Sequence, residues 1–332
     1  MKKIINDPNE VVQEMIAGMI SASPNQLKQV EGTTVITRKD APVENKVGIV
    51  SGGGSGHEPA HAGYIGKGML DAAVLGEVFT SPSVDQVYEG IKAVDSGKGV
   101  FLVIKNYTGD VLNFEMAAEL AEADGMKVAQ VIVNDDVAVE DSSFTTGRRG
   151  IAGTVFVHKI AGAKAELGGT LEEVKEIAEK TVANVRSMGM AISPCAIPAA
   201  GEASFTLAED EMEIGIGIHG EPGIERQKIA TAAEIADELT GKILDDMKLN
   251  KADELAVMIN GLGSTPNMEL FIINEKVQKT LKEKGFHVYR TFVGEYMTAL
   301  EMGGCSVTLL KLDKELKELL DHASDAPNFF VR

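Results

Sequence analysis

The feature that most constrains the fold of this chain of 332 residues is a regular alternation of strand-like and helix-like segments. The strand-like segments are short, apolar and rich in β-branched residues, as buried strands are. They span 47–51, 72–78, 100–105, 127–133, 213–218, 255–260, 287–292 and 306–312. Helix-length segments lie between them, at 83–96, 111–123, 155–167, 171–188, 225–247 and 267–284. This order predicts an α/β fold with mostly parallel or mixed sheets flanked by helices.

A break in the alternation lies between Gly189 and Glu211. The segment Ser193-Pro-Cys-Ala-Ile-Pro contains two prolines and has neither a helical nor a strand period. A single hydrophobic core stops growing at about 250–300 residues, so a chain of this length is expected to form two domains. We therefore predict an N-terminal α/β domain at 1–189 and a C-terminal α/β domain at 190–332.

Charge and composition exclude several classes of function. The chain has 32 Lys and Arg against 50 Asp and Glu, a net charge of −18, so we expect no bulk attraction to nucleic acid or anionic membrane. No apolar run approaches the roughly 20 residues of a membrane helix, and the first residues lack the apolar core of a signal peptide. Cys195 and Cys305 are far apart in sequence and are expected to be free thiols. These features predict a soluble cytoplasmic protein.

The densest motif is the stretch Gly52-Gly-Gly-Ser-Gly-His57-Glu-Pro, which follows the predicted strand 47–51. Successive glycines allow the backbone to approach a ligand closely and to turn its N–H groups toward it. No Gly-Lys pair in the chain is followed by Ser or Thr, so the chain has no P-loop, and the stretch fits a dinucleotide fingerprint poorly. A tight strand-to-helix connection without a ligand is the alternative.

The same stretch contains a zinc-hydrolase pattern, because His57-Glu58-Pro59-Ala60-His61 has the spacing HExxH. That chemistry needs both histidines on one face of a continuous helix, with the glutamate acting on a metal-bound water. Pro59 stands where the helix has to be continuous, and glycines precede His57. We therefore predict no metal here, and expect His61 to be a structural histidine on the following helix.

Two further polar stretches follow the strand 127–133. The acidic run 134–136, with Glu140 and Asp141, has the composition of a metal site but is more typical of a solvated loop. Arg148 and Arg149 lie between two glycines and offer two fixed cations, suitable for a phosphate or for the acidic surface of a partner.

A second candidate motif joins the strand 100–105 to the next helix, in the segment Lys105-Asn-Tyr-Thr-Gly-Asp110. Aspartate is among the best helix caps, so Asp110 has a purely structural interpretation. Its place beside Lys105 and a glycine-rich stretch also makes it a candidate general base, or an acceptor of a hydrogen bond from a substrate hydroxyl.

The third motif is Ile214-Gly-Ile-Gly-Ile-His219-Gly-Glu-Pro. In a strand, Gly215 and Gly217 leave one face bare, as when a ligand packs closely, and the alternation places His219 on that face. His57 and His219 both follow a predicted strand, so both are expected at the carboxyl ends of strands, where open α/β sheets bind ligands. We predict a functional role for His219.

Together these motifs resemble, in order, those of the substrate-binding K subunit of dihydroxyacetone kinase. The matching segments are Gly-Gly-Gly-Ser-Gly-His-Glu-Pro, Lys-Asn-Tyr-Thr-Gly-Asp, Gly-Arg-Arg-Gly and Gly-Ile-His-Gly-Glu-Pro-Gly. The resemblance covers nearly the whole chain. It implies two α/β domains, a homodimer, and a substrate site at the domain junction, where small-ligand pockets commonly lie.

The resemblance also implies residue roles. His219 matches the histidine whose ring nitrogen adds to the ketone carbon to form a hemiaminal. His57 matches the proton acceptor, and Asp110 matches a second acid/base group. The expected substrate-binding residues are Gly54, Ser55, Gly56, Ser81 and Lys105. A nucleophilic imidazole bonds to a carbonyl and not to an alcohol, so this chemistry distinguishes dihydroxyacetone from glycerol.

Finally, the resemblance implies a phosphoryl donor outside this chain. With no phosphate loop and an end at Arg332, the chain resembles the separate-subunit form that depends on the phosphotransferase system (PTS). There an L subunit holds a nucleotide with magnesium, and a phosphocarrier M subunit recharges it. We expect no cofactor and no metal in this chain. The alternative is a non-catalytic dihydroxyacetone sensor that docks on a transcriptional regulator, which the presence of both His57 and Asp110 disfavours.

Overall fold

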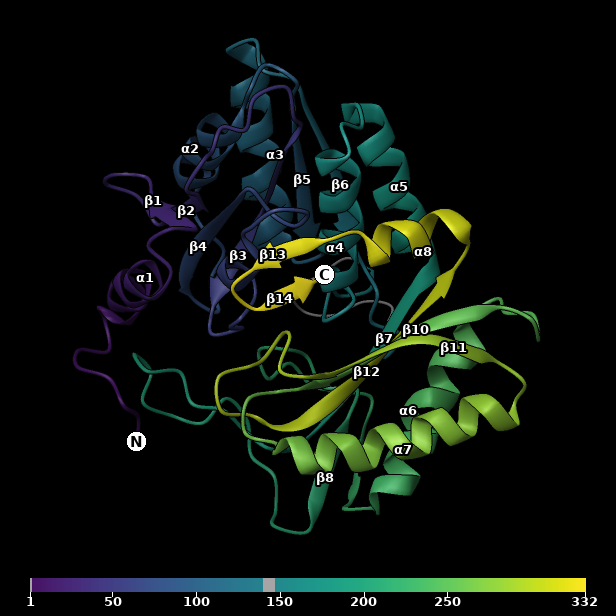
Figure 1. The fold of residues 1–332 in the computed structure, drawn as a ribbon. Coiled ribbons are helices and arrows are strands. Elements are labelled where there is room, and N and C mark those ends of the chain that lie inside the picture. The colour runs from purple at the N-terminus through teal and green to yellow at the C-terminus, as the bar shows by residue number, and fades with distance from the viewer. Residues whose placement is uncertain (1, 140–146) are drawn as a thin grey trace.

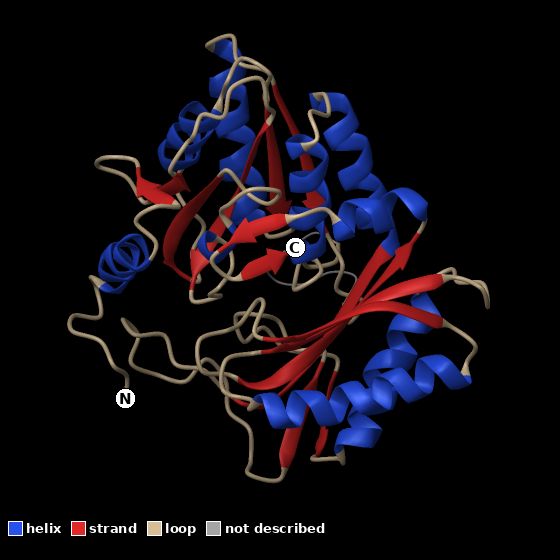
Figure 2. Cartoon of the chain, in the orientation of Figure 1, coloured by secondary structure: helices blue, strands red, loops and turns tan. Residues whose placement is uncertain are grey.

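The structure is a computed structural model that describes residues 2–139 and 147–332. Two six-stranded sheets dominate it, in the orders β1-β2-β4-β3-β5-β6 and β11-β10-β12-β7-β8-β9, with helices packed on both (Figures 1 and 2). The first sheet contains β1 (Leu27–Gln29), β2 (Val35–Arg38), β3 (Gly48–Ser55), β4 (Ala72–Val78), β5 (Val100–Lys105) and β6 (Val128–Val133). The second contains β7 (Val185–Ser193), β8 (Glu211–Ile214), β9 (Glu225–Lys228), β10 (Glu254–Gly261), β11 (His287–Gly294) and β12 (Gly303–Leu312). The predicted α/β class with flanking helices is confirmed.

The helices follow the amphipathic segments of the sequence. They are α1 (Val11–Ala22), α2 (Val84–Val94), α3 (Thr108–Ala123), α4 (Thr154–Glu166), α5 (Leu171–Asn184), α6 (Ala232–Asp246), α7 (Asn267–Glu283) and α8 (Lys314–Asp321), with a short 3₁₀ turn at Ala62–Tyr64. Thr170 and Thr231 each accept a hydrogen bond from the third residue of the helix that follows, and the glutamate at that residue bonds back to the cap. These capping boxes set where α5 and α6 begin.

The first sheet is covered on both faces. Strands β4, β3, β5 and β6 are parallel. At one edge β2 pairs antiparallel with β4, and β1 pairs antiparallel with β2. Along β5, Val100, Leu102 and Ile104 belong to the cluster with α2 and α3, whereas Phe101 and Val103 belong to the cluster with α4 and α5. Since neighbouring residues of a strand point to opposite faces, a strand buried on both faces is apolar throughout.

The second sheet is mixed. Strands β11 and β10 are parallel, whereas β10, β12, β7, β8 and β9 are antiparallel in turn. Helices α6 and α7 cover one face, and the other contributes Ala256, Met258 and Leu310 to the cluster that contains α4. Every residue of α4 except Lys164 and Glu166 is buried, because the helix lies between the two halves of the molecule.

The C-terminal segment returns from the second sheet to the first half of the chain (Figure 1). Helix α8 packs against α4, and the hairpin β13 (Ser324–Ala326) and β14 (Phe329–Val331) follows it. Lys159 Nζ donates a hydrogen bond of 2.7 Å to the carbonyl of Leu319, and the N–H of Asp325 donates to the carbonyl of Lys67 at 2.9 Å. The two halves therefore share one hydrophobic cluster.

Two predicted helices differ from the structure. The segment 225–247 begins with strand β9, and α6 starts only after Thr231. The segment 171–188 ends as a helix at Asn184 and continues as β7, which pairs antiparallel with β12. In both places pairing with another strand overrides the local helical period: β9 pairs with the preceding β8, and β7 pairs with β12. The predicted domain boundary between residues 189 and 190 falls inside β7, and the two-domain division stays a prediction.

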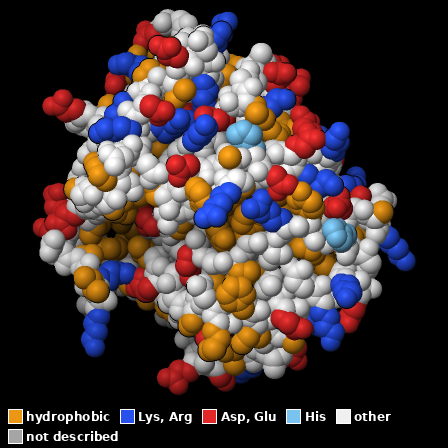
Figure 3. Space-filling model, in the orientation of Figure 1, with side chains coloured by type: hydrophobic (Ala, Val, Ile, Leu, Met, Phe, Trp, Pro, Cys, Tyr) orange, Lys and Arg blue, Asp and Glu red, His pale blue; other side chains and the backbone are white. Residues whose placement is uncertain are grey.

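The surface agrees with the composition. Figure 3 shows Lys and Arg side chains interspersed with Asp and Glu over the visible face, and none of the helices described is long and apolar enough to span a bilayer. Cys195 and Cys305 are both buried free thiols, as expected.

Candidate active site

The glycine-rich stretch differs from the predicted loop, because its first half is the end of β3. Gly52, Gly53 and Gly54 pair with β4. A Cβ on Gly52 would lie 2.3 Å from the carbonyl oxygen of Val74, and one on Gly53 would lie 2.5 Å from Lys105 Nζ. Glycine is therefore required because neighbouring backbone and the Lys105 ammonium occupy the space of a side chain.

His57 follows this strand and is completely buried. Its Nδ1 lies 2.7 Å from the carbonyl oxygen of Thr298, which only accepts, so Nδ1 carries the proton and Nε2 is left as an acceptor. Nε2 has no hydrogen-bond partner among the described residues. Burial, together with the charges of His219 and Lys105, lowers the pKa of His57 well below its ordinary value of 6.5. The ring is thus a neutral base near pH 7.

Lys105 and Asp110 form a buried ion pair at the end of β5 and the start of α3. Lys105 Nζ lies 3.1 Å from Asp110 Oδ2, and both side chains are almost inaccessible. Asp110 stands in the first turn of α3, where the helix dipole favours a negative charge. The residue before the helix, Tyr107, makes no side-chain capping hydrogen bond. Asp110 lies inside the first turn and pairs with Lys105 instead of capping the helix.

His219 lies on the loop after β8 and is held by a carboxylate two residues away. Glu221 Oε1 accepts a hydrogen bond of 2.7 Å from His219 Nδ1, and Oε2 accepts one from the backbone N–H of His219. Burial by itself would raise the pKa of Glu221, but the charge of protonated His219, the hydrogen bond from the ring and Arg149 together lower it. Because an ionised carboxylate only accepts, the neutral ring carries its proton on Nδ1 and has a free lone pair on Nε2.

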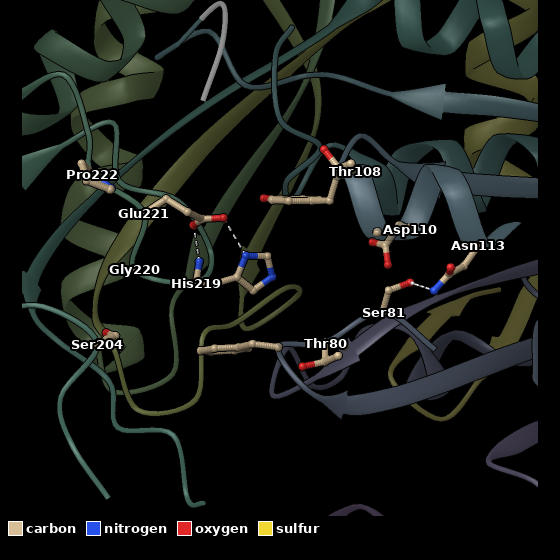
Figure 4. Close-up of a pocket in the computed structure, with 14 residues that line it drawn as sticks. Thr80, Ser81, Thr108, Asp110, Asn113, Ser204, His219, Gly220, Glu221 and Pro222 are labelled. Carbon is tan, nitrogen blue, oxygen red and sulfur yellow. Dashed lines mark hydrogen bonds and ion pairs between the residues drawn. The ribbon is translucent and has the colours of Figure 1, made fainter. Parts of the chain in front are cut away.

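The two histidines meet at a pocket between the halves of the chain. The ring of His219 lies 4.8 Å from that of His57 and 4.8 Å from that of Tyr107, between ring centroids. The pocket has a volume of about 700 Å³. In Figure 4 the ring of His219 points into the space in front of Asp110 and Ser81. An imidazole, a carboxylate and a hydroxyl therefore face one space.

The predicted site residues divide into three groups. Gly54, Ser81, Asp110 and His219 line the pocket. Lys105 and His57 lie directly behind it, against Asp110 and His219. Ser55 and Gly56, by contrast, do not line it: Ser55 Oγ donates to the carbonyl of Gly76 at 2.7 Å, and the N–H of Gly56 donates to Glu58. These two residues hold the end of β3.

Sequence reasoning missed Phe79, Tyr107 and the role of Glu221. Phe79 stacks on His57 at 5.0 Å and meets the edge of the His219 ring at 5.0 Å. Tyr107 packs on His219 from the other half of the site. The phenylalanine carried no signal in the sequence, whereas the spacing His-x-Glu at 219–221 was a signal available for a ring held by a carboxylate.

The HExxH pattern does not form a metal site. His57 and His61 do not share a helix, and His61 Nδ1 lies 2.9 Å from Nε2 of the buried His158. Burial, and then the charge of Lys105, lowers the pKa of both His61 and His158, the latter to about 3. In the described part of the chain no three His, Cys, Asp or Glu side chains are grouped as metal ligands. His61 is structural, although it precedes a 3₁₀ turn rather than lying on a helix.

The acidic run 134–136 is not a solvated loop. Asp135 is buried and accepts hydrogen bonds of 2.8 Å from the N–H groups of Ile151 and Gly153. Asp136 is also buried, and pairs with Arg149 at 2.7 Å. Glu140 and Asp141 lie outside the described residues.

The two arginines are not both at the surface either. Arg149 is fully buried, so the prediction that it offers a charge to a phosphate or a partner is wrong for this residue. Arg148 forms an ion pair with Asp246.

Comparisons with known proteins agree with the geometry. Residues 17–328 match the Dak1 domain. A protein of Listeria innocua serovar 6a, named PTS-dependent dihydroxyacetone kinase 1, dihydroxyacetone-binding subunit DhaK, is 56% identical over 315 residues, which cover 95% of each chain.

Two solved structures are similar over almost all of this chain. The dihydroxyacetone kinase of C. freundii in complex with AMP-PNP and Mg²⁺ matches with a TM-score of 0.92 and 39% identity, covering 99% of this chain and 61% of that chain. The dihydroxyacetone kinase operon co-activator Dha-DhaQ matches with a TM-score of 0.91 and 37% identity, covering 98% of this chain and 99% of that chain.

Proposed function

This chain belongs to the Dak1 domain family, and from that premise we propose that it is the dihydroxyacetone-binding subunit of a PTS-dependent dihydroxyacetone kinase. The relative at 56% identity carries that name. The observation that supports the proposal most strongly is the position and tautomer of the His219 ring. Its ring borders the pocket, and Glu221 holds the proton on Nδ1, which leaves the Nε2 lone pair available for attack on a carbonyl carbon.

In the proposed first step, His219 Nε2 bonds to the central carbon of dihydroxyacetone. The electron pair of the carbonyl π bond moves to oxygen, which takes a proton and becomes the hydroxyl of a hemiaminal. The ring then carries a positive charge, and Glu221 lies against Nδ1 to stabilise it. A three-carbon ketone forms few contacts, so the covalent bond supplies affinity that hydrogen bonds alone lack.

In the proposed second step, a terminal hydroxyl of the bound sugar attacks the terminal phosphorus of the donor nucleotide. The bond between that phosphorus and the bridging oxygen breaks, and the nucleotide leaves with one phosphoryl group fewer. Asp110 is the group that accepts the proton of the hydroxyl, and Lys105 keeps Asp110 in place within the buried pair. His57 offers a neutral acceptor nitrogen beside the adduct, since its Nε2 is unpartnered among the described residues. Gly54 and Ser81 are proposed to contact the substrate.

The phosphoryl donor in this proposal is a nucleotide with magnesium on an L subunit, recharged by a phosphocarrier M subunit. A pocket of about 700 Å³ is much larger than a three-carbon sugar and leaves room for the donor to enter. The homodimer expected from the resemblance is part of the same proposal, and analytical ultracentrifugation of the purified chain tests it.

The adduct is tested with dihydroxyacetone labelled with ¹³C at the carbonyl carbon. On binding to the wild-type chain, its NMR signal moves from the ketone region to that of a tetrahedral carbon. The variant His219→Asn is expected to lose this signal, whereas His322→Asn, at a half-buried histidine after α8, is expected to keep it. A tetrahedral signal that persists in His219→Asn contradicts the proposal.

A sensor without kinase activity is the second candidate, since the co-activator structure matches at a TM-score of 0.91. A sensor needs His219 but not Asp110 or His57 as acid/base groups. Mixing the purified chain with L subunit, phosphorylated donor and dihydroxyacetone distinguishes the two. Formation of dihydroxyacetone phosphate supports the kinase, and its absence with all components active supports the sensor.

A further inference from the structure

Arg149 is a buried cation that the proposed reaction leaves without a role. Its side chain is completely inaccessible. Nε donates to Asp136 Oδ2 at 2.8 Å, and Nη2 lies 2.7 Å from the same oxygen and donates to the carbonyl of Gly215 at 2.7 Å. The segment around Arg149 is thereby tied to the loop that carries His219.

The remaining nitrogen of Arg149 borders the same small space as the carboxylate that holds His219. Nη1 has no hydrogen-bond partner among the described residues. A Cβ on Gly217 would lie 2.7 Å from this nitrogen and 1.9 Å from Glu221 Oε2, so both atoms border the space that Gly217 leaves empty. Gly217 is thus the residue that allows the guanidinium and the carboxylate to approach.

Two buried carboxylates act on the Arg149 guanidinium. Asp136 is ion-paired with it, and Glu221, which holds His219, contributes its charge from across the space at Gly217. Burial raises the pKa of Asp136 to about 6, even though Arg149 lowers it. Burial also opposes the charge of Glu221, whose pKa His219 and then Arg149 lower. Without Arg149, Glu221 would take up a proton or leave its buried position, because an unpaired buried charge is costly.

We propose that Asp136, Arg149 and Glu221 form a buried relay that fixes the tautomer and orientation of the His219 ring, with Arg149 as a positioning residue that acts through Glu221. Asp136 and Arg149 come from the first half of the chain, and Glu221 and His219 come from the second. The relay therefore sets where the nucleophile of one half stands relative to His57 and Asp110 of the other. Only its consequence for the substrate rests on the proposed function.

The first test measures the tautomer in the ligand-free protein. Nitrogen-15 NMR of the His219 ring is expected to report a proton on Nδ1 in the wild type, and a mixture of Nδ1 and Nε2 protonation in Arg149→Gln. The matched control is Arg38→Gln, which removes another buried, ion-paired arginine, at the end of β2. It is expected to leave the tautomer unchanged. An unchanged tautomer in Arg149→Gln overturns the relay.

The second test asks whether Arg149 acts through Glu221. Arg149→Gln is expected to slow adduct formation with dihydroxyacetone about tenfold, in the range usual for coupled neighbours. In the background Glu221→Gln, the same change is expected to have almost no further effect. If Arg149→Gln slows adduct formation by the same factor in the wild type and in Glu221→Gln, the two residues act independently. That result would show a general loss of structure and would overturn the proposal.

A variant that buries an unpaired charge can fail to fold, and a double variant avoids this. Asp136→Asn with Arg149→Gln removes both charges, and it is expected to give the same mixed tautomer. The two proposals can fail separately. If the wild-type chain forms no adduct but the His219 tautomer still changes in Arg149→Gln, the proposed function is refuted and the relay is supported. If the wild-type chain forms the adduct but the His219 tautomer is the same in Arg149→Gln, the proposed function is supported and the relay is refuted.

Discussion

The rings of His57 and His219 lie 4.8 Å apart between centroids, but they are held in opposite ways. His57 is fully buried at the end of a strand, and the carbonyl of Thr298 fixes its ring. His219 stands on a loop with 21% of its side chain exposed, and a carboxylate two residues away holds it. A base can act from within the core, whereas a nucleophile that captures a ligand has to be reachable. The site therefore combines the buried ring of His57, the proposed acid/base group, with the more accessible ring of His219, the proposed nucleophile.

The largest expected effect separates the chemistry of the two halves. Asp110→Asn removes the proposed proton acceptor, so turnover is expected to fall by about 10²–10⁴, the usual contribution of general base catalysis. The adduct on His219 is expected to form as in the wild type. Coupled assay of dihydroxyacetone phosphate, together with NMR of the labelled ketone, measures both. Unchanged turnover would remove Asp110 from the mechanism.

The next effect concerns stability, and it also differs between the halves. Lys105→Met leaves Asp110 as a buried carboxylate without its cation, which is expected to lower the free energy of unfolding by about 3–5 kcal/mol. His219→Ala, at the accessible loop, is expected to cost about 1 kcal/mol. Urea denaturation measures both variants. Equal losses would show that His219 contributes as much to the free energy of unfolding as the pairing of Lys105 with Asp110 does.

The buried histidines predict a loss of stability in acid. Burial lowers the pKa of His57, His61 and His158, the last to about 3, so these rings stay neutral in the folded protein. In the unfolded chain they take up protons near pH 6.5, so the unfolded state binds more protons below that pH. Each ring then removes about 1.4 kcal/mol of stability per pH unit.

Urea denaturation at about pH 7 and about pH 5.5 measures this slope. His158→Gln is expected to make the slope shallower than His287→Gln does, because the His287 side chain is 69% exposed. A slope that does not respond to His158→Gln contradicts the assignment of the neutral state to this ring.

The smallest effect is expected at Ser81, which lines the pocket from the turn before α2. Its hydroxyl lies 3.4 Å from the amide nitrogen of Asn113, and a single neutral hydrogen bond contributes about 0.5–1.5 kcal/mol. Ser81→Ala is therefore expected to weaken the binding of dihydroxyacetone about 2–10-fold, with the adduct still formed. Titration calorimetry measures the affinity, and an affinity equal to that of the wild type would exclude a contact between Ser81 and the substrate.

Elements with a strong local pattern were predictable. The predicted strands 72–78 and 100–105 coincide with β4 and β5, because strands buried on both faces are apolar along their whole length. The predicted helix 171–188 begins where α5 does, at Leu171, directly after the cap Thr170. The strands β7 and β9 were missed, since each is defined by pairing with another strand, β7 with the distant β12 and β9 with the preceding β8, rather than by its own period.

The candidate site was predictable in its residue types but not in its geometry. The glycine-rich stretch was expected to be a loop that surrounds a ligand, yet it completes β3, because its glycines make room for β4 and Lys105. Arg149 was expected to offer its charge at the surface, where arginine is usually found, but it is buried and its charge is paired with Asp136.

By itself, the sequence determined the α/β class, the extent of the most apolar strands and the presence of a nucleophile, a base and a carboxylate in glycine-rich surroundings. Only the tertiary structure decided which of these side chains meet. His57 takes its orientation from a carbonyl 241 residues away, and the His219 ring packs on Tyr107 of the first half. Contacts at such separations depend on how two sheets pack around α4, and no local period in the chain encodes that packing.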